Sequence, residues 1–435
     1  MSELLTQLAQ LAQFGSATRL YALTINSNGR DSSTDYGSSG LQVEAFAAVE
    51  GLHSIGARDI IVLSTNAHIP LKTLLGRSAT LQISLSDGTR AAFTGLINEA
   101  ALLGSEGGFA RYRVRLVPWP WLLTQSRSSR VWQDKTVIDI IESIFREYSA
   151  HAAWQWSSEV APFMTEARTR SYVAQYRESN FDFVSRLLSE EGLSFRIEES
   201  TTAPSGHQIV LFADTTQKSA CPEDATSSHA LGGHGIRFHA GTAREEQDSI
   251  QALSARRTLQ AGAITLLSYD YKTKKAVTAH IPTHHAFGGK QAPLLESYDS
   301  PGPYAYANSA EALRYGQLHM QAHEARNKRW YARSTVRTLR PGTTFDLTQG
   351  PLNAAANAAP VPYTVLRVAS IGINNLPKNV SEGIAELFGP IPQLLEECMA
   401  SCTAAAPASA VACEDGFADG AESGFGFGFE SDDNN

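Results

Sequence analysis

The chain has 435 residues, and at about 150 residues per domain this length predicts two to four domains. Hydrophobic residues make up 43% of the chain and charged residues 18%, a composition typical of globular proteins. The net charge of −8 argues against a nucleic-acid partner, because proteins that bind nucleic acid usually carry a basic excess.

The first segment, MSELLTQLAQLAQFG, predicts a short amphipathic helix and no secretion signal. Its leucines share one helical face, and it lacks both a basic start and a continuous apolar stretch. No apolar run in the chain approaches the roughly 20 residues that span a bilayer. We therefore expect no stable membrane insertion and no N-terminal export signal.

Residues 15–122 predict a first antiparallel β-barrel domain. The segment ATLQISLSDGTRAAFTGLI holds two short strands around Asp87-Gly88, a favoured hairpin turn. A later strand alternates between an apolar face and a basic face, which consist of Tyr112, Val114 and Leu116 and of Arg111, Arg113 and Arg115. We expect one face in a core and the other toward a lumen or a neighbouring molecule.

Residues 123–215 predict an α/β insertion domain. Apolar residues recur at helical spacing from Val137 to Tyr148, after a capping pair of Thr136 and Asp139. The stretch YRESNFDFVSRLLSEEGLSFRIEE, residues 176–199, reads as a capped helix, a stop at Gly192 and a strand.

The six carboxylates of that stretch raise the question of an acid/base site. Glycosidase-type catalysis needs two carboxylates that face each other across a cleft, one of them desolvated. Glu190, Glu191, Glu198 and Glu199 fall at the helix end or on the outer side of the strand. We interpret them as a solvent-exposed face of a packing element.

Residues 216–285 and 329–375 predict a second β-barrel domain, interrupted by a helical insertion over 286–328. GAITLLSYDYK alternates as a strand, and RWYARSTVRTLRPGTTFDL holds two more strands around a Pro-Gly turn. The inserted helix should run from about Ser309 to Lys328, with Asn308 and Glu311 as its capping pair.

The C-terminal part differs in composition and charge. Residues 376–400 predict a short helical segment. Residues 379–435 contain 11 Asp/Glu and no Lys/Arg, which leaves 36 basic and 44 − 11 = 33 acidic residues in 1–378. Ala, Gly, Ser and acids dominate the end of the chain, so 401–435 is predicted to be a disordered acidic tail.

The sequence predicts no catalytic, cofactor-binding or metal site. The cysteines Cys221, Cys398, Cys402 and Cys413 form no CxxC pair and are expected to be free thiols. GxSxG, P-loop and GxGxxG motifs do not occur. The expectation is a protein without cofactors and without enzymatic activity.

One enzymatic alternative stays open at this point. His319 and His323 lie at i, i+4 on one face of the predicted helix, and His284 and His285 lie in a loop. The zincin pattern HExxH is absent, because Met320 follows His319. The alternative is a metal-dependent hydrolase built from these four histidines.

Five long stretches resemble the VgrG/Vgr family of type VI secretion spike proteins: GGFARYRVRLVPWPWLL, SRVWQDKTVIDIIESIF, YVAQYRESNFDFVSRLLSEEGLSFRIEE, RSTVRTLRPGTTFDLT and VLRVASIGINNLPK. The resemblance runs from about Ala17 to about Glu397. It implies an α+β, mainly β fold of the phage baseplate hub type, with two antiparallel β-barrels joined by smaller α/β insertions.

The resemblance also implies a function. Three copies would form a homotrimer, whose ring of six barrels matches the hexameric Hcp tube on which the spike sits. The expected role is a non-enzymatic hub delivered with effectors. The implied localisation is the bacterial cytoplasm, followed by export through the type VI apparatus without a signal peptide.

The chain departs from the family pattern after the hub. Family members usually continue into an OB-fold and a β-helix needle, and neither the His/Asp/Gly-rich stretch nor the FHWD-like strand of that region occurs here. A separate spike tip, adaptor or effector protein is therefore an expected partner. The alternative is a truncated or degenerate copy without export function.

Overall fold

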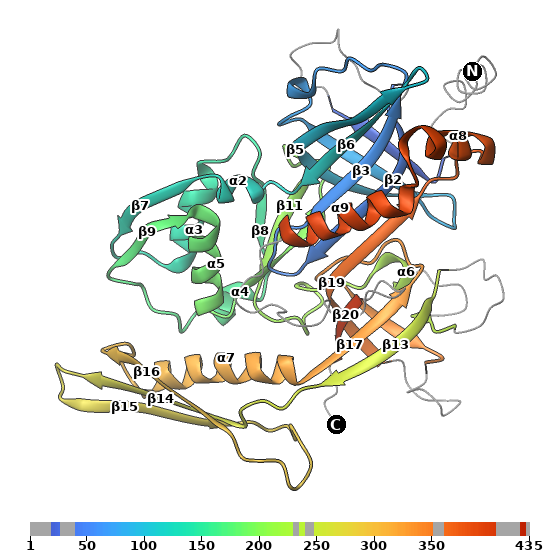
Figure 1. The fold of residues 1–435 in the computed structure, drawn as a ribbon. Helices are drawn as coiled ribbons and strands as arrows, with labels where there is room; N and C mark the ends of the chain where they lie inside the picture. Colours follow the sequence, from blue (N-terminus) through green and yellow to red (C-terminus); the bar gives the residue numbers. More distant parts are fainter. Residues whose placement is uncertain are drawn as a thin grey trace.

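The computed structural model describes residues 19–26, 40–228, 235–239, 248–350, 361–405 and 427–431. Strands form most of the regular structure of this part of the chain. They make one twelve-stranded sheet, two three-stranded sheets and one two-stranded sheet. Figure 1 shows two β domains, a mixed domain beside them and a long arm.

The first β domain consists of six antiparallel strands in the order β1-β4-β5-β6-β3-β2. Their bounds are β1 Tyr21–Ile25, β2 Gln42–Gly51, β3 Ala57–Ser64, β4 Ser78–Ser84, β5 Arg90–Glu106 and β6 Phe109–Val117, with a short 3-10 helix η2 at Leu71–Thr73. The apolar face of β6, which carries Tyr112, Val114 and Leu116, lies in the core of this domain. The predicted alternation of this strand is thus confirmed.

Asn374 joins β1 and β2, the two outer strands of the first β domain. Its Nδ2 donates to the carbonyls of Tyr21 at 3.0 Å and Val43 at 2.7 Å, and its Oδ1 accepts from the Tyr21 N–H at 3.2 Å. The rings of Tyr21 and Phe46 meet edge to face at 5.0 Å. A side chain therefore takes the place of a backbone ladder at this seam.

The insertion domain contains two small sheets, β10-β11-β8 and β7-β9, with helices between them. Its elements are α2 Trp121–Thr124, β7 Arg127–Trp132, α3 Val137–Arg146, β8 Trp154–Trp156, α4 Val160–Phe163, β9 Val173–Ser179, α5 Asn180–Glu190, β10 Ser194–Glu199 and β11 His207–Phe212. Thr136 and Asp139 form the predicted capping box of α3, and Ser179 accepts from the Asp182 N–H at 3.0 Å. Gly192 ends α5 with φ +72, as its position predicts.

The second β domain is joined to the first through one strand. Its elements are α6 Ala225–Ser228, β12 Ile236–Arg237, β13 Ile250–Arg257, β17 Lys328–Ser334, β18 Thr344–Thr348, β19 Val361–Ile373 and β20 Phe427–Ser431. The first half of β19 pairs with β18, and its second half pairs with β2 of the first domain. The two β domains therefore share a continuous sheet.

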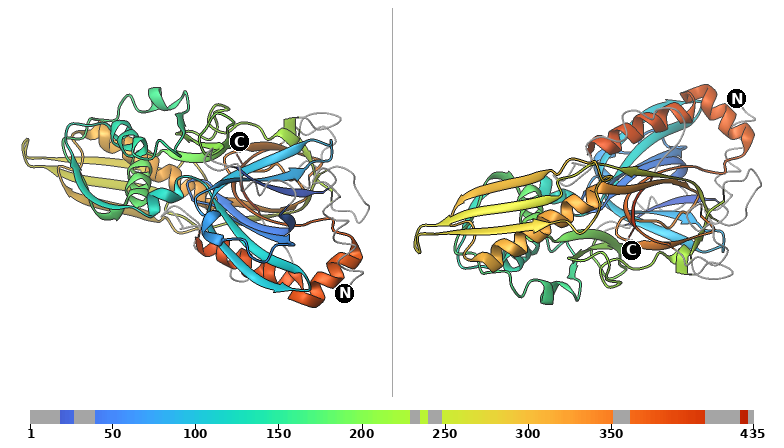
Figure 2. Two further views of the ribbon diagram at one scale, coloured as in Figure 1. Left: turned by 90° about the horizontal axis from the view of Figure 1, so that it is seen from above. Right: turned by 90° about the horizontal axis from the view of Figure 1, so that it is seen from below.

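The arm is a separate unit formed by β14 Ala263–Asp270, β15 Lys275–Pro282, β16 Glu296–Pro303 and α7 Ser309–Asn327 (Figures 1 and 2). The prediction that β14 and β15 belong to the second barrel is wrong, because both pair within the three-stranded sheet of the arm. Alternate residues such as Ile264, Leu266 and Ile281 bury one face of that sheet. Gly316 of α7 permits close contact, since a Cβ there would lie 2.2 Å from Ile281 Cδ1.

The C-terminal part is more ordered than its composition predicts. Two helices, α8 Lys378–Phe388 and α9 Ile391–Ala405, replace the single short segment expected at 376–400. The predicted disorder from residue 401 is wrong for the end of α9. Residues 427–431 form β20, whose backbone pairs with neighbouring strands. The rest of the tail and the predicted N-terminal helix lie outside the described residues. None of the described helices is long and apolar enough to cross a membrane.

Candidate functional site

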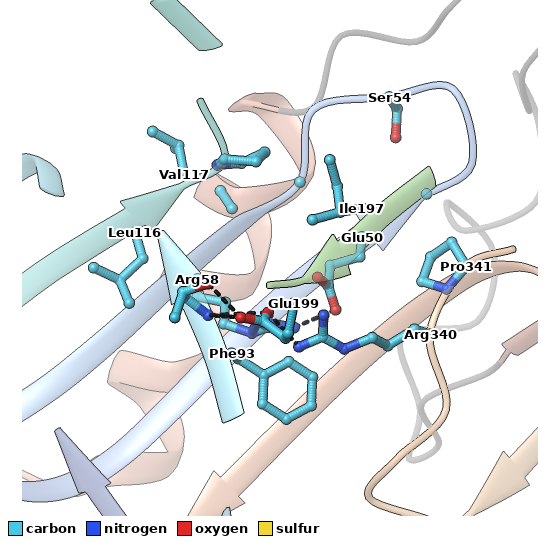
Figure 3. Close-up of a pocket in the computed structure, with 15 residues that line it drawn as sticks. Glu50, Ser54, Arg58, Phe93, Leu116, Val117, Ile197, Glu199, Arg340 and Pro341 are labelled. Carbon is cyan, nitrogen blue, oxygen red and sulfur yellow. Dashed lines mark hydrogen bonds and ion pairs between the residues drawn. The ribbon is translucent and has the colours of Figure 1, made fainter. Parts of the chain in front are cut away.

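Charged residues gather where the insertion domain touches the rest of the chain. The first contact, the barrel junction, consists of Glu50, Arg58, Phe93, Glu199 and Arg340 (Figure 3). The first three come from β2, β3 and β5, Glu199 ends β10, and Arg340 precedes β18. The insertion domain and both β domains therefore meet at one point.

Two guanidinium groups and two carboxylates are paired at the barrel junction. Arg58 binds Glu50, and Arg340 Nη2 lies 2.8 Å from Glu199 Oε1. The Cζ atoms of both arginines lie 4.0 Å from the centroid of the Phe93 ring, within range of a cation–π contact. Burial lowers the pKa of Arg58, and the carboxylate of Glu50 opposes this change. The adjoining cavity of about 30 Å³ has room for about one water, which fits a packing role.

Two buried histidines fasten the insertion domain near the barrel junction. His207 Nε2 accepts the backbone N–H of Trp119 at 2.8 Å, and its Nδ1 lies 3.0 Å from the Ser205 carbonyl. His53, in the loop between β2 and β3, has its ring 5.1 Å from that of Phe195. Burial lowers the pKa of both histidines to about 4. Both are therefore neutral near pH 7.

The second contact, the arm junction, consists of Arg170, Glu191, Arg314 and Tyr315. Glu191 follows α5 and is only 1% exposed. Its carboxylate accepts from Arg170 Nη2 at 2.6 Å, from Arg314 Nη1 at 2.8 Å and from the Tyr315 hydroxyl at 3.1 Å. Arg314 and Tyr315 lie on α7, so this one carboxylate binds the arm to the insertion domain. Burial and the charge of Glu191 raise the pKa of Tyr315 to about 12.

The interpretation of the four glutamates as a solvent-exposed face is wrong for two of them. Glu191 is buried in the arm junction, and Glu199 is paired in the barrel junction. The side chains of Glu190 and Glu198 remain 38% and 43% exposed, as expected. The packing role is retained, but two of the acids act between domains.

Neither junction has the arrangement of a carboxylate acid/base pair. A general acid of the glycosidase kind needs a desolvated carboxyl whose pKa is raised. Glu191 and Glu199 instead each accept from a guanidinium, and neither faces a second carboxylate across a cleft. The geometry supports rigid attachment of domains.

The basic face of β6 is covered by the chain's own C-terminal helices. Arg111 donates to Glu44 at 2.9 and 2.7 Å and to the carbonyl of the last residue of α8 at 3.1 Å. Arg115 donates to Asp59 at 2.8 and 2.7 Å and to Ser401 of α9 at 2.6 Å. The hydrogen bonds to Asp59 raise the pKa of Arg115. The expectation of a lumen or a neighbour at this face is wrong for these two arginines.

The four histidines of the metal hypothesis do not form a metal site. His284, His285 and His319 are exposed, and His323 Nδ1 lies 3.3 Å from Gln260 Oε1. Within the described part of the chain, no group of three His, Cys, Asp or Glu side chains is placed to hold a metal ion. Cys221, Cys398 and Cys402 are buried thiols.

Two curated relatives align with most of the described chain. The type VI secretion system spike protein VgrG1b of Pseudomonas aeruginosa is 31% identical over 321 residues, which cover 72% of this chain and 40% of that protein. VgrG1a of the same organism is 31% identical over 315 residues, which cover 70% of this chain and 44% of that protein. The chain thus spans about two-fifths of the length of these relatives.

The solved structures confirm the mainly β hub fold. The E. coli c3393 protein, described as a type VI secretion component similar to the T4 tail proteins gp27 and gp5, superposes with a TM-score of 0.51. It is 20% identical, and the match covers 81% of this chain and 73% of that one. The profile of the phage tail baseplate hub (GPD) family matches residues 49–376. The chain therefore belongs to the phage tail baseplate hub (GPD) family and is a relative of the VgrG spike proteins.

Proposed function

We propose that this protein is a structural hub of a type VI secretion apparatus and has no enzymatic role. Three copies form a ring that sits on the hexameric Hcp tube and moves with it when the sheath contracts. A separate spike tip, adaptor or effector binds the ring. The protein is made in the bacterial cytoplasm and leaves through the apparatus. We retain the predicted domain boundaries, which place the insertion domain at residues 123–215 between the two β domains.

One observation carries the mechanical role beyond the family match. β19 crosses from one β domain to the other. A buried carboxylate, Glu191, binds the arm to the insertion domain, and the partly buried pair of Glu199 and Arg340 binds the insertion domain to this frame. A part that transmits force must resist rotation between its domains. Buried carboxylate–guanidinium pairs resist such rotation because separating them leaves uncompensated charges.

The mass of the full chain in solution tests the proposal. Sedimentation equilibrium at micromolar concentration should give the mass of a trimer, and added Hcp hexamers should co-sediment with it. A ring joined by the same two patches three times requires this stoichiometry. A chain that stays monomeric and does not co-sediment with Hcp would contradict the proposed hub function and would favour a degenerate copy without export function. Secretion that depends on the sheath would support the hub in cells.

A further inference from the structure

The C-terminal strand β20 lies between two strands that come from distant parts of the chain. On one edge it pairs with β17, where Phe429 is opposite Trp330 and Phe427 is opposite Ala332. On the other edge it pairs with β19, where Phe429 is opposite Val365. Among the residues that the structure describes, the sheet order is β19-β20-β17, and β17 does not pair directly with β19.

β20 also completes a circuit of strands around the second β domain. β19 pairs with β18, and β18 pairs with β12. A bridge from Phe238 to Ile250 leads to β13, which pairs with β17. The circuit then returns to β19 through β20 alone, and Figure 2 shows these strands around a common centre. Without β20, β17 and β19 would each present an unpaired edge.

Two facing strand edges without hydrogen-bond partners form a template for an added strand. Extended peptides bind such edges through main-chain hydrogen bonds, and their alternate side chains provide specificity. Here the two edges carry buried apolar residues of the domain core, among them Trp330, Ala332 and Val365. The slot therefore suits a strand with an apolar residue at every second position.

The resident strand has this pattern. It reads FGFES, with phenylalanine and glycine in alternation. It is separated from α9 by residues 406–426, which at about 3.3 Å per residue can span up to roughly 70 Å. Its pairings in the sheet are with β17 and β19, so it is held by the ladder and not by a tight turn.

We propose that the gap between β17 and β19 is a strand-binding slot for extended peptides with an aromatic residue at every second position. The chain's own Phe427–Ser431 is its resident and exchangeable occupant. Release of this strand opens the second β domain to another peptide of the same pattern. This inference does not depend on the secretion role.

Cleavage of the linker after folding tests the slot without risk to folding. A protease site is placed within residues 406–426 of the full chain, in a Cys413→Ser background. After cleavage, a fluorescent peptide with the sequence SGFGFGFESDD should bind one-to-one, measured by anisotropy. The control peptide SGFFGGFESDD has the same composition but no two phenylalanines two positions apart, and it should bind at least about tenfold more weakly because it cannot offer rings at successive positions of one face.

A disulfide lock supplies the second control. Ala332 and Phe427 are direct partners across β17 and β20, and such pairs have Cα atoms about 4.5–5.5 Å apart, which a disulfide can bridge. In the variant Ala332→Cys/Phe427→Cys, the oxidised chain should take up at least about tenfold less peptide than the reduced chain, since the resident strand cannot leave. Lack of uptake by the cleaved chain, or equal uptake by the locked chain, would overturn the proposal. A disulfide that forms between chains would overturn the chain's own strand as the occupant.

Discussion

Replacing Glu191 with glutamine tests the arm junction directly. The native carboxylate is 1% exposed and accepts from Arg170, Arg314 and Tyr315. Glutamine keeps the shape of the side chain but removes the charge. Its NH₂ group cannot accept the hydrogen bonds that the second carboxylate oxygen accepts. Removing one partner of a buried ion pair costs about 3–5 kcal/mol. Since Arg170 also binds Glu190, we expect a loss of about 3 kcal/mol, at the lower end of that range.

Hydrogen exchange in α7 measures this loss where it should occur. A loss of about 3 kcal/mol corresponds to roughly 100-fold faster exchange of the protected amides of α7, if they open by release of the arm. The matched control is Glu190→Gln, because Glu190 is the adjacent residue, is 38% exposed and pairs with Arg170 and Arg186. Exposed pairs contribute at most about 1 kcal/mol, so exchange should change less than about fivefold. Equal effects of the two substitutions would refute the reasoning.

Three further predictions concern pH, thiols and one glycine. The pKa of His53 and His207 is about 4 when folded and near 6.5 when unfolded, so the unfolded state binds more protons between these values. The free energy of unfolding, measured by urea titration, should be constant above pH 6.5 and fall toward pH 4 by up to about 3 kcal/mol per histidine. The substitution His53→Phe should remove the part of this pH dependence that His53 contributes. Burial raises the pKa of the two α9 thiols to about 11 and about 12, so Ellman's reagent at pH 8 should modify them only in denaturant. Gly192→Ala should destabilise by about 1–3 kcal/mol, since φ is +72 and its Cβ would lie 2.6 Å from a leucine of α7, and more than Gly76→Ala, which has φ +76 and open space.

The parts of the fold that depend on neighbouring residues could be predicted from the sequence. The capping box of α3 and the stop at Gly192 each involve residues within one helical turn. The two faces of β6 follow from the period of a strand. The assignment of β14 and β15 was wrong because a strand's pattern does not identify the sheet that it joins. Their apolar face packs against α7, and this pairing is set by tertiary contacts.

The two domain junctions could not be found in this way, because their partners are far apart in the chain. Glu191 and Arg314 are 123 residues apart, and Arg314 lies on a helix whose sequence mixes apolar and polar residues. A cluster of glutamates at a helix end has the same local appearance whether it faces water or another domain. The basic face of β6 was predicted, but its cover was not. Arg111 and Arg115 pair with Glu44 and Asp59, which lie on other strands, and the helices over them come from the far end of the chain. These helices lie beyond the family match, where the sequence predicted one short helical segment and no contact with β6. In this protein the interdomain role of a charged residue is therefore determined by what packs over it.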